Sequence, residues 1–241
     1  MSPTWREIWS GREVSDRLQT EESLDAYLLR ADGYDTPFGS VEPEAWLRSV
    51  DQILRQLKLR PGHSIFEIGC GAGAFLIEPW RRGHQVGGID LSPELINLAR
   101  AVIPDGRFQV ADAEHFTASE PWHTVVACGV MMYLRSTEKA ENIIKKMAST
   151  AQHSIALLDL PDLAFKDEAE AFRRASLTEE AYRERYTGLD HLYFDRNRIR
   201  EVLLGLGFDE VVIADQAIEG YRNGAFRFNA LASHRSGPSP V

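Results

Sequence analysis

A glycine-rich loop next to an acidic residue is the feature of this sequence best suited to small-molecule chemistry. The loop reads Glu67-Ile68-Gly69-Cys70-Gly71-Ala72-Gly73-Ala74, and it follows a predicted strand and opens a predicted helix. Glycines let the backbone take positive φ and approach a ligand closely. The N-terminus of a helix adds free N–H groups and the positive end of its dipole. The loop therefore predicts a site for a nucleoside-type ligand.

The glycines alone do not identify that ligand. Gly69, Gly71 and Ala74 also satisfy the dinucleotide pattern G-x-G-x-x-G/A. Glu67 argues for a different ligand, because a carboxylate at the end of a strand repels a pyrophosphate but can hold an ammonium group. Gly73 extends the motif to G-x-G-x-G.

Two further acids end the next two predicted strands. Asp90 follows Gly88-Ile89, where its carboxylate can accept both ribose hydroxyls, and Asp112 follows Val110-Ala111, where it can bind an exocyclic amine. Parallel strands present their carboxyl ends at one edge of a sheet, so the three acids are expected to share one crevice. They suit a ligand with an amine, a ribose and an adenine but no phosphate, which describes S-adenosyl-L-methionine.

With these motifs, the chain from about Leu57 to Leu160 resembles the class I S-adenosylmethionine-dependent methyltransferases. The resemblance implies an α/β fold. Its Rossmann-like seven-stranded sheet would be mostly parallel, with an antiparallel strand 7 and helices on both faces. It also implies the cofactor-binding residues Glu67, Gly69, Cys70, Gly71, Gly73, Asp90, Leu91, Asp112, Ala113, Cys128 and Gly129. Among these, Leu91 would lie against the adenine, Ala113 would meet its edge, and Cys128 and Gly129 would offer backbone groups near the methionine amine.

The elements that must position these residues alternate along the chain. Apolar runs predict strands at Ser64–Ile68, Gln85–Ile89, Arg107–Val110, Thr124–Cys128 and Ser154–Leu158. Helices are predicted near Ala74–Arg82, Pro93–Val102, Thr137–Ala151 and Arg196–Leu206, with Ser92 and Pro93 starting the second and Gly207 ending the last. This alternation predicts a parallel sheet covered on both faces.

The end of the chain departs from that alternation. Phe208–Ala214 and Ala225–Ala232 predict two strands without a helix between them, hence an antiparallel pair at one edge of the sheet. Arg227 alternates with apolar neighbours. Arg227 or Arg222 could hold an acceptor carboxylate through two hydrogen bonds, but for Arg227 we favour a surface charge on an edge strand. Gly83 and the pair Gly87-Gly88 are expected to be ordinary turn and strand-entry glycines.

The predicted organisation is one domain with a covering segment. Residues 1–60 are predicted as an N-terminal helical lid carrying Trp9, Tyr27, Tyr34 and Phe38, and residues 61–235 as the methyltransferase domain. An insertion at about 161–195 is expected to help build the acceptor pocket. The Pro-rich tail 236–241 is predicted to be disordered.

The composition of the chain disfavours several classes of partner. The chain has 241 residues and a net charge of -9, which disfavours nucleic acid as a partner. No apolar run approaches the ~20 residues of a membrane span, and the polar N-terminus resembles no signal peptide, so a cytoplasmic protein is expected. No spacing of the two cysteines and seven histidines indicates a metal site. A monomer or a homodimer fits these data equally well.

The acceptor is expected to be a small molecule. The Asn/Asp-Pro-Pro-Tyr motif that clamps a flipped-out base is missing from the segment after the fourth strand, Cys128-Gly129-Val130-Met131-Met132-Tyr133-Leu134. Methyl transfer to oxygen or nitrogen needs in-line positioning and, for some acceptors, a base. The expected catalytic residues are His191, Asp159 and Tyr133, and the expected substrate-binding residues are Tyr34, Tyr186 and Arg222.

Each of these candidates also has a purely structural interpretation: His191 as a surface histidine, Asp159 as a turn residue, Tyr133 as a core residue and Arg222 as a surface charge. A weaker similarity, carried by Leu158-Asp159-Leu160-Pro161-Asp162 and Phe226-Arg227-Phe228-Asn229, indicates secondary-metabolite methylation. Two alternatives remain open on the sequence: an NAD(P)-dependent oxidoreductase using the same glycine loop, and a catalytically inert cofactor-binding partner protein.

Overall fold

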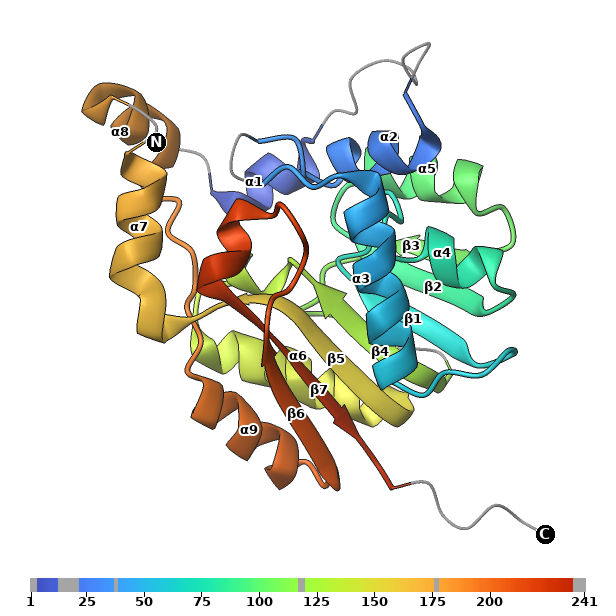
Figure 1. Cartoon of the computed structure of the whole chain (residues 1–241). Helices are drawn as coiled ribbons and strands as arrows, with labels where there is room; N and C mark the ends of the chain where they lie inside the picture. Colours follow the sequence, from blue (N-terminus) through green and yellow to red (C-terminus); the bar gives the residue numbers. More distant parts are fainter. Residues whose placement is uncertain (1–3, 13–21, 37–38, 117–119, 176–177, 236–241) are drawn as a thin grey trace, which may run out of the picture.

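The fold is built on a seven-stranded sheet, seen in a computed structural model that describes residues 4–12, 22–36, 39–116, 120–175 and 178–235 (Figure 1). Its strand order is β3-β2-β1-β4-β5-β7-β6, and β7 runs antiparallel to both of its neighbours. The strands are β1 (Ser64–Ile68), β2 (Gln85–Asp90), β3 (Arg107–Val110), β4 (Trp122–Cys128), β5 (Ala151–Pro161), β6 (Glu210–Asp215) and β7 (Arg227–Ser233). The predicted fold class is confirmed. Phe38 and the tail 236–241 lie outside the described residues.

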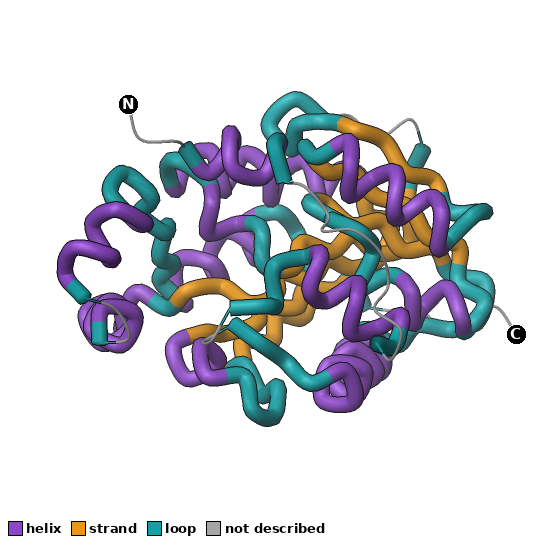
Figure 2. Tube along the Cα trace, turned by 90° about the horizontal axis from the view of Figure 1, so that it is seen from above, coloured by secondary structure: helices purple, strands orange, loops and turns teal. Residues whose placement is uncertain are grey.

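Helices cover both faces of the sheet, as Figure 2 shows with helices in purple and strands in orange. The buried residues form two clusters, because successive side chains of a strand point to opposite faces. In β1, Ile65 joins the first cluster and Phe66 the second. The first cluster contains residues of α3 (Pro43–Gln56), α4 (Ile77–Arg81) and α5 (Pro93–Val102), and the second contains residues of α6 (Thr137–Thr150) and α9 (Arg196–Gly205).

The helix signals in the sequence hold with one exception. Ser92 caps α5 by accepting a hydrogen bond from the Leu95 N–H, with Pro93 in the first turn. Helix α4 begins at Ile77 instead of near Ala74. The N–H groups of Ala72 and Ala74 donate to the carboxylate of Asp32, so a distant side chain holds the segment before the helix.

Segments from four parts of the chain gather at the carboxyl ends of the parallel strands. Helices α1 (Trp5–Ser10) and α2 (Leu24–Ala31) lie across this edge at the top of Figure 1. The short η1 (Met131–Tyr133) follows β4 directly. The insertion after β5 contains η2 (Leu163–Phe165), α7 (Lys166–Arg174) and α8 (Glu179–Tyr186), and η3 (Arg222–Phe226) leads into β7. The expected covering segment and insertion are thus built from helices.

The paired glycines of β2 do more than begin a strand, which corrects the expectation for them. Both lie within β2, and Gly88 pairs with Glu67 of β1. A Cβ on Gly88 would lie 2.6 Å from the Cβ of Cys70 and 2.8 Å from the backbone oxygen of Glu67. Only glycine lets the glycine loop pack this closely on β2.

We expect Gly88→Ala to lower the free energy of unfolding by about 1–3 kcal/mol, because backbone at the Glu67 oxygen must move to admit a methyl group. Urea denaturation measures the change. Gly205→Ala is the control, since nothing lies within 4 Å of a Cβ there. Equal stabilities of the two variants would contradict the packing argument.

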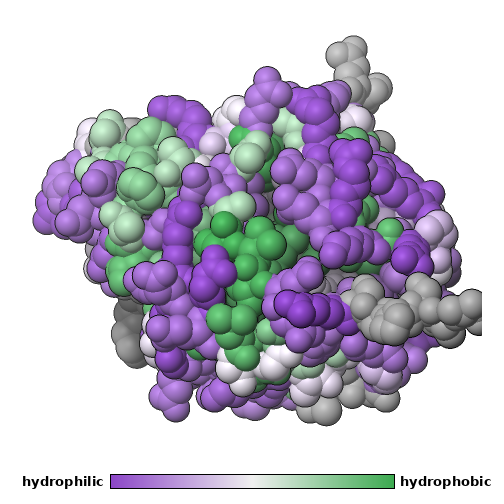
Figure 3. Space-filling model, turned by 60° about the horizontal axis from the view of Figure 1, so that its bottom comes forward, coloured by the Kyte–Doolittle hydropathy of each residue, from purple (hydrophilic) through white to green (hydrophobic). Residues whose placement is uncertain are grey.

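The face seen in Figure 3 is mostly hydrophilic, with hydrophobic residues gathered near its centre. The exposed large hydrophobic residues include Val212 on the edge strand β6 and Leu204 on α9. Within the described ranges, no helix has the length and apolar character needed to cross a membrane.

Candidate cofactor and acceptor site

The glycine loop turns directly after β1 and is tied to β2. The N–H groups of Gly69 and Cys70 both donate to the carbonyl of Ile89, at 2.8 and 2.9 Å. Gly69, Gly71 and Gly73 have φ values of +72°, +52° and +93°, which favour glycine. A Cβ on Gly69 would lie 2.6 Å from a methyl group of Val130. The loop thus needs its glycines both for backbone conformation and for close packing.

The three acids at the strand ends line one cavity with this loop. The Oδ1 of Asp90 accepts the Ser92 N–H at 2.8 Å, and its Oδ2 accepts the Gly71 N–H at 3.0 Å. Glu67 is only 3 % exposed, and its Oε2 is buried with no hydrogen-bond partner among the described residues. Burial raises the pKa of Glu67 well above its usual value, with Asp32 and Asp90 nearby adding to the effect. An unpartnered buried carboxyl group is what a missing cationic ligand would leave.

Asp112 has a different environment. Its Oδ1 accepts the Glu114 N–H at 2.9 Å, and its Oδ2 pairs with the guanidinium of Arg6 from α1. Burial alone would raise the pKa of Asp112, but these two partners bring it below its usual value. Arg6 therefore ties the N-terminal helix to the acid at the end of β3.

Asp32 is a fourth acid in the cavity, and it was not predicted from the sequence. It follows α2, and its carboxylate accepts the Ala72 N–H at 2.5 Å and the Ala74 N–H at 3.0 Å. Burial raises the pKa of Asp32 to about 7 despite these hydrogen bonds, and the charge of Asp90 adds to the rise. No sequence pattern indicates this contact, because it joins residues far apart in the chain.

The raised pKa values predict that the ligand-free protein loses stability as pH rises. A group whose pKa is higher in the folded state keeps a proton that the unfolded chain releases. Each such proton lowers the free energy of unfolding by about 1.4 kcal/mol per pH unit. For Asp32, the loss runs from its usual value of 3.8 up to about 7.

Urea denaturation at pH 5, 6, 7 and 8 measures this slope. Asp32→Asn should flatten the slope between pH 5 and 7, whereas Asp35→Asn, an exposed carboxyl nearby, should leave it unchanged. Equal slopes for the wild type and Asp32→Asn would contradict the assignment.

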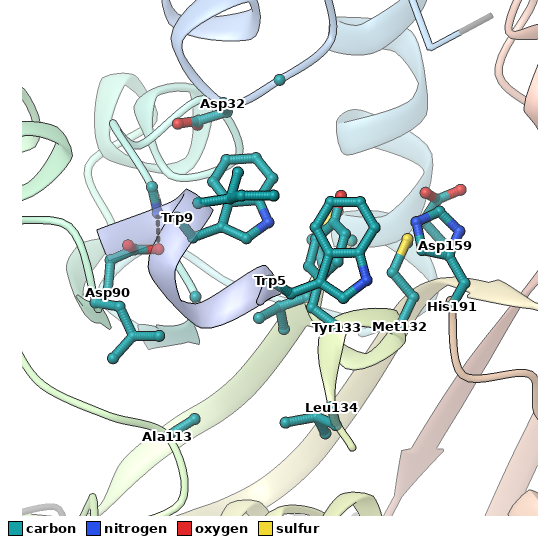
Figure 4. A pocket seen from close by; sticks show the side chains of 18 of the residues that line it. Trp5, Trp9, Asp32, Asp90, Ala113, Met132, Tyr133, Leu134, Asp159 and His191 are labelled. Atoms are coloured by element: carbon teal, nitrogen blue, oxygen red, sulfur yellow. Dashed lines mark hydrogen bonds between the residues drawn. The ribbon is translucent and has the colours of Figure 1, made fainter. Parts of the chain in front are cut away.

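Aromatic residues form the wall between the two ends of the cavity, as Figure 4 shows for Trp5, Trp9 and Tyr133. The ring of Tyr133 lies 4.8 Å from that of Trp5 and 5.2 Å from that of Trp9. His191 stacks on Trp5 at 5.2 Å, and the indole N–H of Trp5 donates to the backbone oxygen of Asp190. Helix α1 thus supplies part of the site. Of its residues, the sequence predicted only Trp9 to cover the site.

Asp159 lies at the far end of the cavity in a fixed orientation. Its φ is +61°, an uncommon value for a non-glycine residue, and its N–H donates to the side-chain oxygen of Asn229. Tyr221 donates to its Oδ2 at 2.9 Å and Gln216 to its Oδ1 at 3.3 Å. Arg227 donates to its backbone oxygen at 3.1 Å. The carboxylate therefore has little rotational freedom.

Two groups beside the aromatic wall differ in their proton chemistry. Burial lowers the pKa of His191 well below its usual value, and the nearby guanidinium groups of Arg173 and Arg227 lower it further. Burial raises the pKa of Tyr133 to about 12. At neutral pH His191 is thus a neutral imidazole that can accept a proton, and Tyr133 is a phenol that can donate a hydrogen bond.

The structure brings most of the predicted site residues into this one cavity of about 1340 Å³. All the residues predicted to bind the cofactor line it except Gly73, which packs toward Ile103 and Ala99 behind the loop. Tyr34, Tyr133, Asp159, Tyr186 and His191 line it as well. The volume exceeds the ~300–1,000 Å³ of a typical small-molecule pocket, so it can hold two ligands.

Arg222 and Arg227 each have the environment that was predicted for the other. Arg222, expected to bind substrate, is exposed and not on the cavity wall; its guanidinium lies 4.9 Å from the ring of Phe172. Arg227, expected to be a surface charge, lines the cavity and is only 8 % exposed. The physical reason is that β7 lies between β5 and β6 and is not an edge strand, and every residue of β7 but the last is buried.

Comparison with known proteins agrees with this geometry. A family model described as a methyltransferase domain matches residues 65–153. An uncharacterized methyltransferase of Geobacillus kaustophilus is 31% identical over 198 residues, which cover 76% of this chain and 86% of that protein. A trans-aconitate 2-methyltransferase of an Azoarcus species is 29% identical over 90 residues, covering 36% of this chain and 35% of that protein.

Solved structures with low sequence identity share the fold. A magnesium protoporphyrin IX methyltransferase from Synechocystis superposes with a TM-score of 0.60 at 17% identity, covering 83% of this chain and 87% of that one. An amino pentose methyltransferase from Micromonospora echinaspora gives a TM-score of 0.58 at 14% identity, covering 78% and 91%. The site, the fold and the Geobacillus relative, which matches over most of its own length, together show that the chain belongs to the class I S-adenosylmethionine-dependent methyltransferases.

Proposed function

We propose that this methyltransferase transfers the methyl group of S-adenosylmethionine to an oxygen or nitrogen of a small-molecule acceptor. The observation that carries the proposal is a single cavity with two different ends. Asp90 lies at one end, and Asp159 and His191 lie at the other beyond Trp5 and Trp9 (Figure 4). Glu67 and Gly71 line the cavity near Asp90. Such a cavity can bring two ligands together for in-line displacement.

The residues of the first end suit the cofactor. Glu67 would hold the methionine ammonium, because its Oε2 is buried and has no hydrogen-bond partner in the part of the chain that the structure describes. Asp90 would accept the ribose hydroxyls, Leu91 would lie against the adenine, and Asp112 with Ala113 would meet the adenine edge. When bound, S-adenosylmethionine supplies an electrophilic sulfonium methyl group.

The residues of the second end suit positioning and proton transfer. His191, neutral and beside Trp5, would accept a proton from an acceptor hydroxyl or ammonium. Tyr133 would donate a hydrogen bond that orients the acceptor. The fixed carboxylate of Asp159 would help to position the acceptor. Tyr34, whose hydroxyl lies 3.9 Å from the sulfur of Cys128, would line the path between the two ligands.

Residues 1–60 would act as a lid in this proposal. Three contacts support it: Arg6 pairs with Asp112, Asp32 accepts hydrogen bonds from the glycine loop, and Trp5 packs on Tyr133. Each joins the N-terminal segment to a different part of the cavity. The insertion at 161–195 contributes Arg173, Tyr186 and His191 to the same cavity.

The names of similar proteins support a small acceptor, since they describe a porphyrin, an amino pentose and trans-aconitate as targets. Calorimetry tests the cofactor part: we expect micromolar binding of S-adenosylhomocysteine and none of NAD. The acceptor part is tested by the formation of S-adenosylhomocysteine with a panel of small hydroxyl and amine compounds. Binding of NAD in place of S-adenosylhomocysteine, or methylation confined to nucleic acid, would overturn the proposal.

A further inference from the structure

Arg227 is a buried guanidinium group with unused hydrogen-bonding capacity on the cavity wall. It is only 8 % exposed, and its Nη1 contacts the sulfur of Met132 and donates to the backbone oxygen of Asp159. Among the described residues, Nη1 makes every hydrogen bond of this guanidinium, and Nε and Nη2 are not among the fully buried atoms that lack a partner, so they are accessible from the cavity that Arg227 lines. Burying a guanidinium is costly unless its donors are paired.

Asp159 does not complete the pairing of Arg227. Its Oδ2 lies 3.5 Å from Nη1 and already accepts the Tyr221 hydroxyl at 2.9 Å, while its Oδ1 accepts from Gln216. A guanidinium and a carboxylate that pair fully form two parallel hydrogen bonds. The guanidinium of Arg227 and the carboxylate of Asp159 share one long contact, so the Nε and Nη2 donors of Arg227 are left for a ligand.

A second arginine offsets the acidic groups at this end of the cavity. Arg173 of α7 lines the cavity, donates to the hydroxyl of Tyr193 at 2.9 Å and lies 5.9 Å from the ring of Tyr186. The acidic groups facing this end are Asp159 and the exposed Asp190. The opposite end carries Asp32, Glu67, Asp90 and Asp112. The cavity is therefore acidic where the cationic cofactor would bind, whereas the two arginines balance the two acids where the acceptor would bind.

We propose that the acceptor is a carboxylate-bearing molecule with a flat, unsaturated body, and that Arg227 holds its carboxylate. This inference rests on the proposed function and deepens it. A planar carboxylate matches the fork of a guanidinium. The flat body matches the rings of Trp5, Tyr133 and His191, which stand 4.8–5.6 Å apart along the wall. Arg173 adds a second positive charge that attracts the same anion.

The wild-type protein tests the inference directly. The full chain, saturated with S-adenosylhomocysteine, is titrated calorimetrically with benzoate and cinnamate and with the matching amides. We expect each acid to bind about tenfold to a hundredfold more tightly than its amide, since a charged hydrogen-bonded pair is lost with the amide. Equal binding of acids and amides, or no binding of either acid, would overturn the inference.

Variants locate the effect. Arg227→Gln should abolish the preference for the acid, and Arg227→Lys should retain part of it. Arg174→Gln, on the next residue of α7 after Arg173, is the control, because Arg174 is exposed and not on the cavity wall. A preference for the acid that survives in Arg227→Gln would assign the anion to another residue and overturn the role of Arg227.

Two measurements keep the test independent of folding and of the proposed function. Removing Arg227 leaves Asp159 buried, so the double variant Arg227→Gln/Asp159→Asn supplies a version with balanced charge, and it too should lose the preference. Each variant is first titrated with S-adenosylhomocysteine alone. If the wild type fails to bind S-adenosylhomocysteine, the proposed function is contradicted. If the wild type binds S-adenosylhomocysteine but does not prefer the acids, only the inferred acceptor class is contradicted.

Discussion

Replacing Asp90 with alanine should weaken the binding of S-adenosylhomocysteine by about a hundredfold or more, since two hydrogen bonds to a charged group are lost. The carboxylate of Asp90 accepts the Ser92 and Gly71 N–H groups and borders the cavity with its remaining lone pairs. Those lone pairs are the ones assigned to the ribose hydroxyls. The substitution also frees the Gly71 N–H, so the loop loses one of its ties to β2.

Calorimetry with S-adenosylhomocysteine measures the effect, and Glu94→Gln in the first turn of α5 serves as the control because Glu94 is exposed. Asp90→Asn separates the two contributions. It keeps one acceptor for the backbone but loses the charge, so we expect an intermediate affinity. An affinity of Asp90→Ala equal to that of the wild type would refute the ribose assignment.

The strands and the glycine loop were predictable because their signals are local. The run Ser64–Ile68 and the Ser92-Pro93 start of α5 match the structure residue by residue. The acids Glu67, Asp90 and Asp112 lie at or just after strand ends, so predicting the strands also placed the acids in one crevice. Their location follows from topology alone.

The failures involve contacts between distant segments. Arg227 was taken for a surface charge because its neighbours alternate in hydropathy, as they do in a half-exposed strand. In the fold β7 pairs on both sides, and Arg227 meets Asp159 across a sequence separation that no local pattern reports. Asp32 escaped notice for the same reason, because its partners Ala72 and Ala74 belong to the glycine loop.

The acceptor end was the least predictable part of the site. His191, Tyr186 and Arg173 come from the insertion, and Trp5 and Arg6 come from the first described helix. Each position looks like an ordinary helix or loop residue in the sequence. Their chemistry arises only when α1 and the insertion close over the strand ends. Methyl transfer requires little more of the protein than such positioning, so its residues leave no compact motif.

Glu67→Gln should change stability and binding in opposite directions. The Glu67 carboxyl is buried without a partner for Oε2, and burial raises its pKa well above the usual value. In the ligand-free protein at pH 8, Glu67 must either stay buried as a charged group or take up a proton, and both lower the free energy of unfolding. A neutral glutamine avoids both. We therefore expect the free energy of unfolding of the variant to equal or exceed that of the wild type.

The same substitution should weaken the binding of S-adenosylhomocysteine by about tenfold or more, because the methionine ammonium loses its charged partner. Urea denaturation and calorimetry on one preparation give both quantities, with the exposed Glu219→Gln as the control. A Glu67 that served packing alone would lose stability and leave affinity nearly unchanged on substitution. A carboxylate whose role is to bind a cationic ligand must instead lose affinity while stability is kept. Burying this carboxylate destabilises the ligand-free protein, and that destabilisation is offset only when the ligand binds.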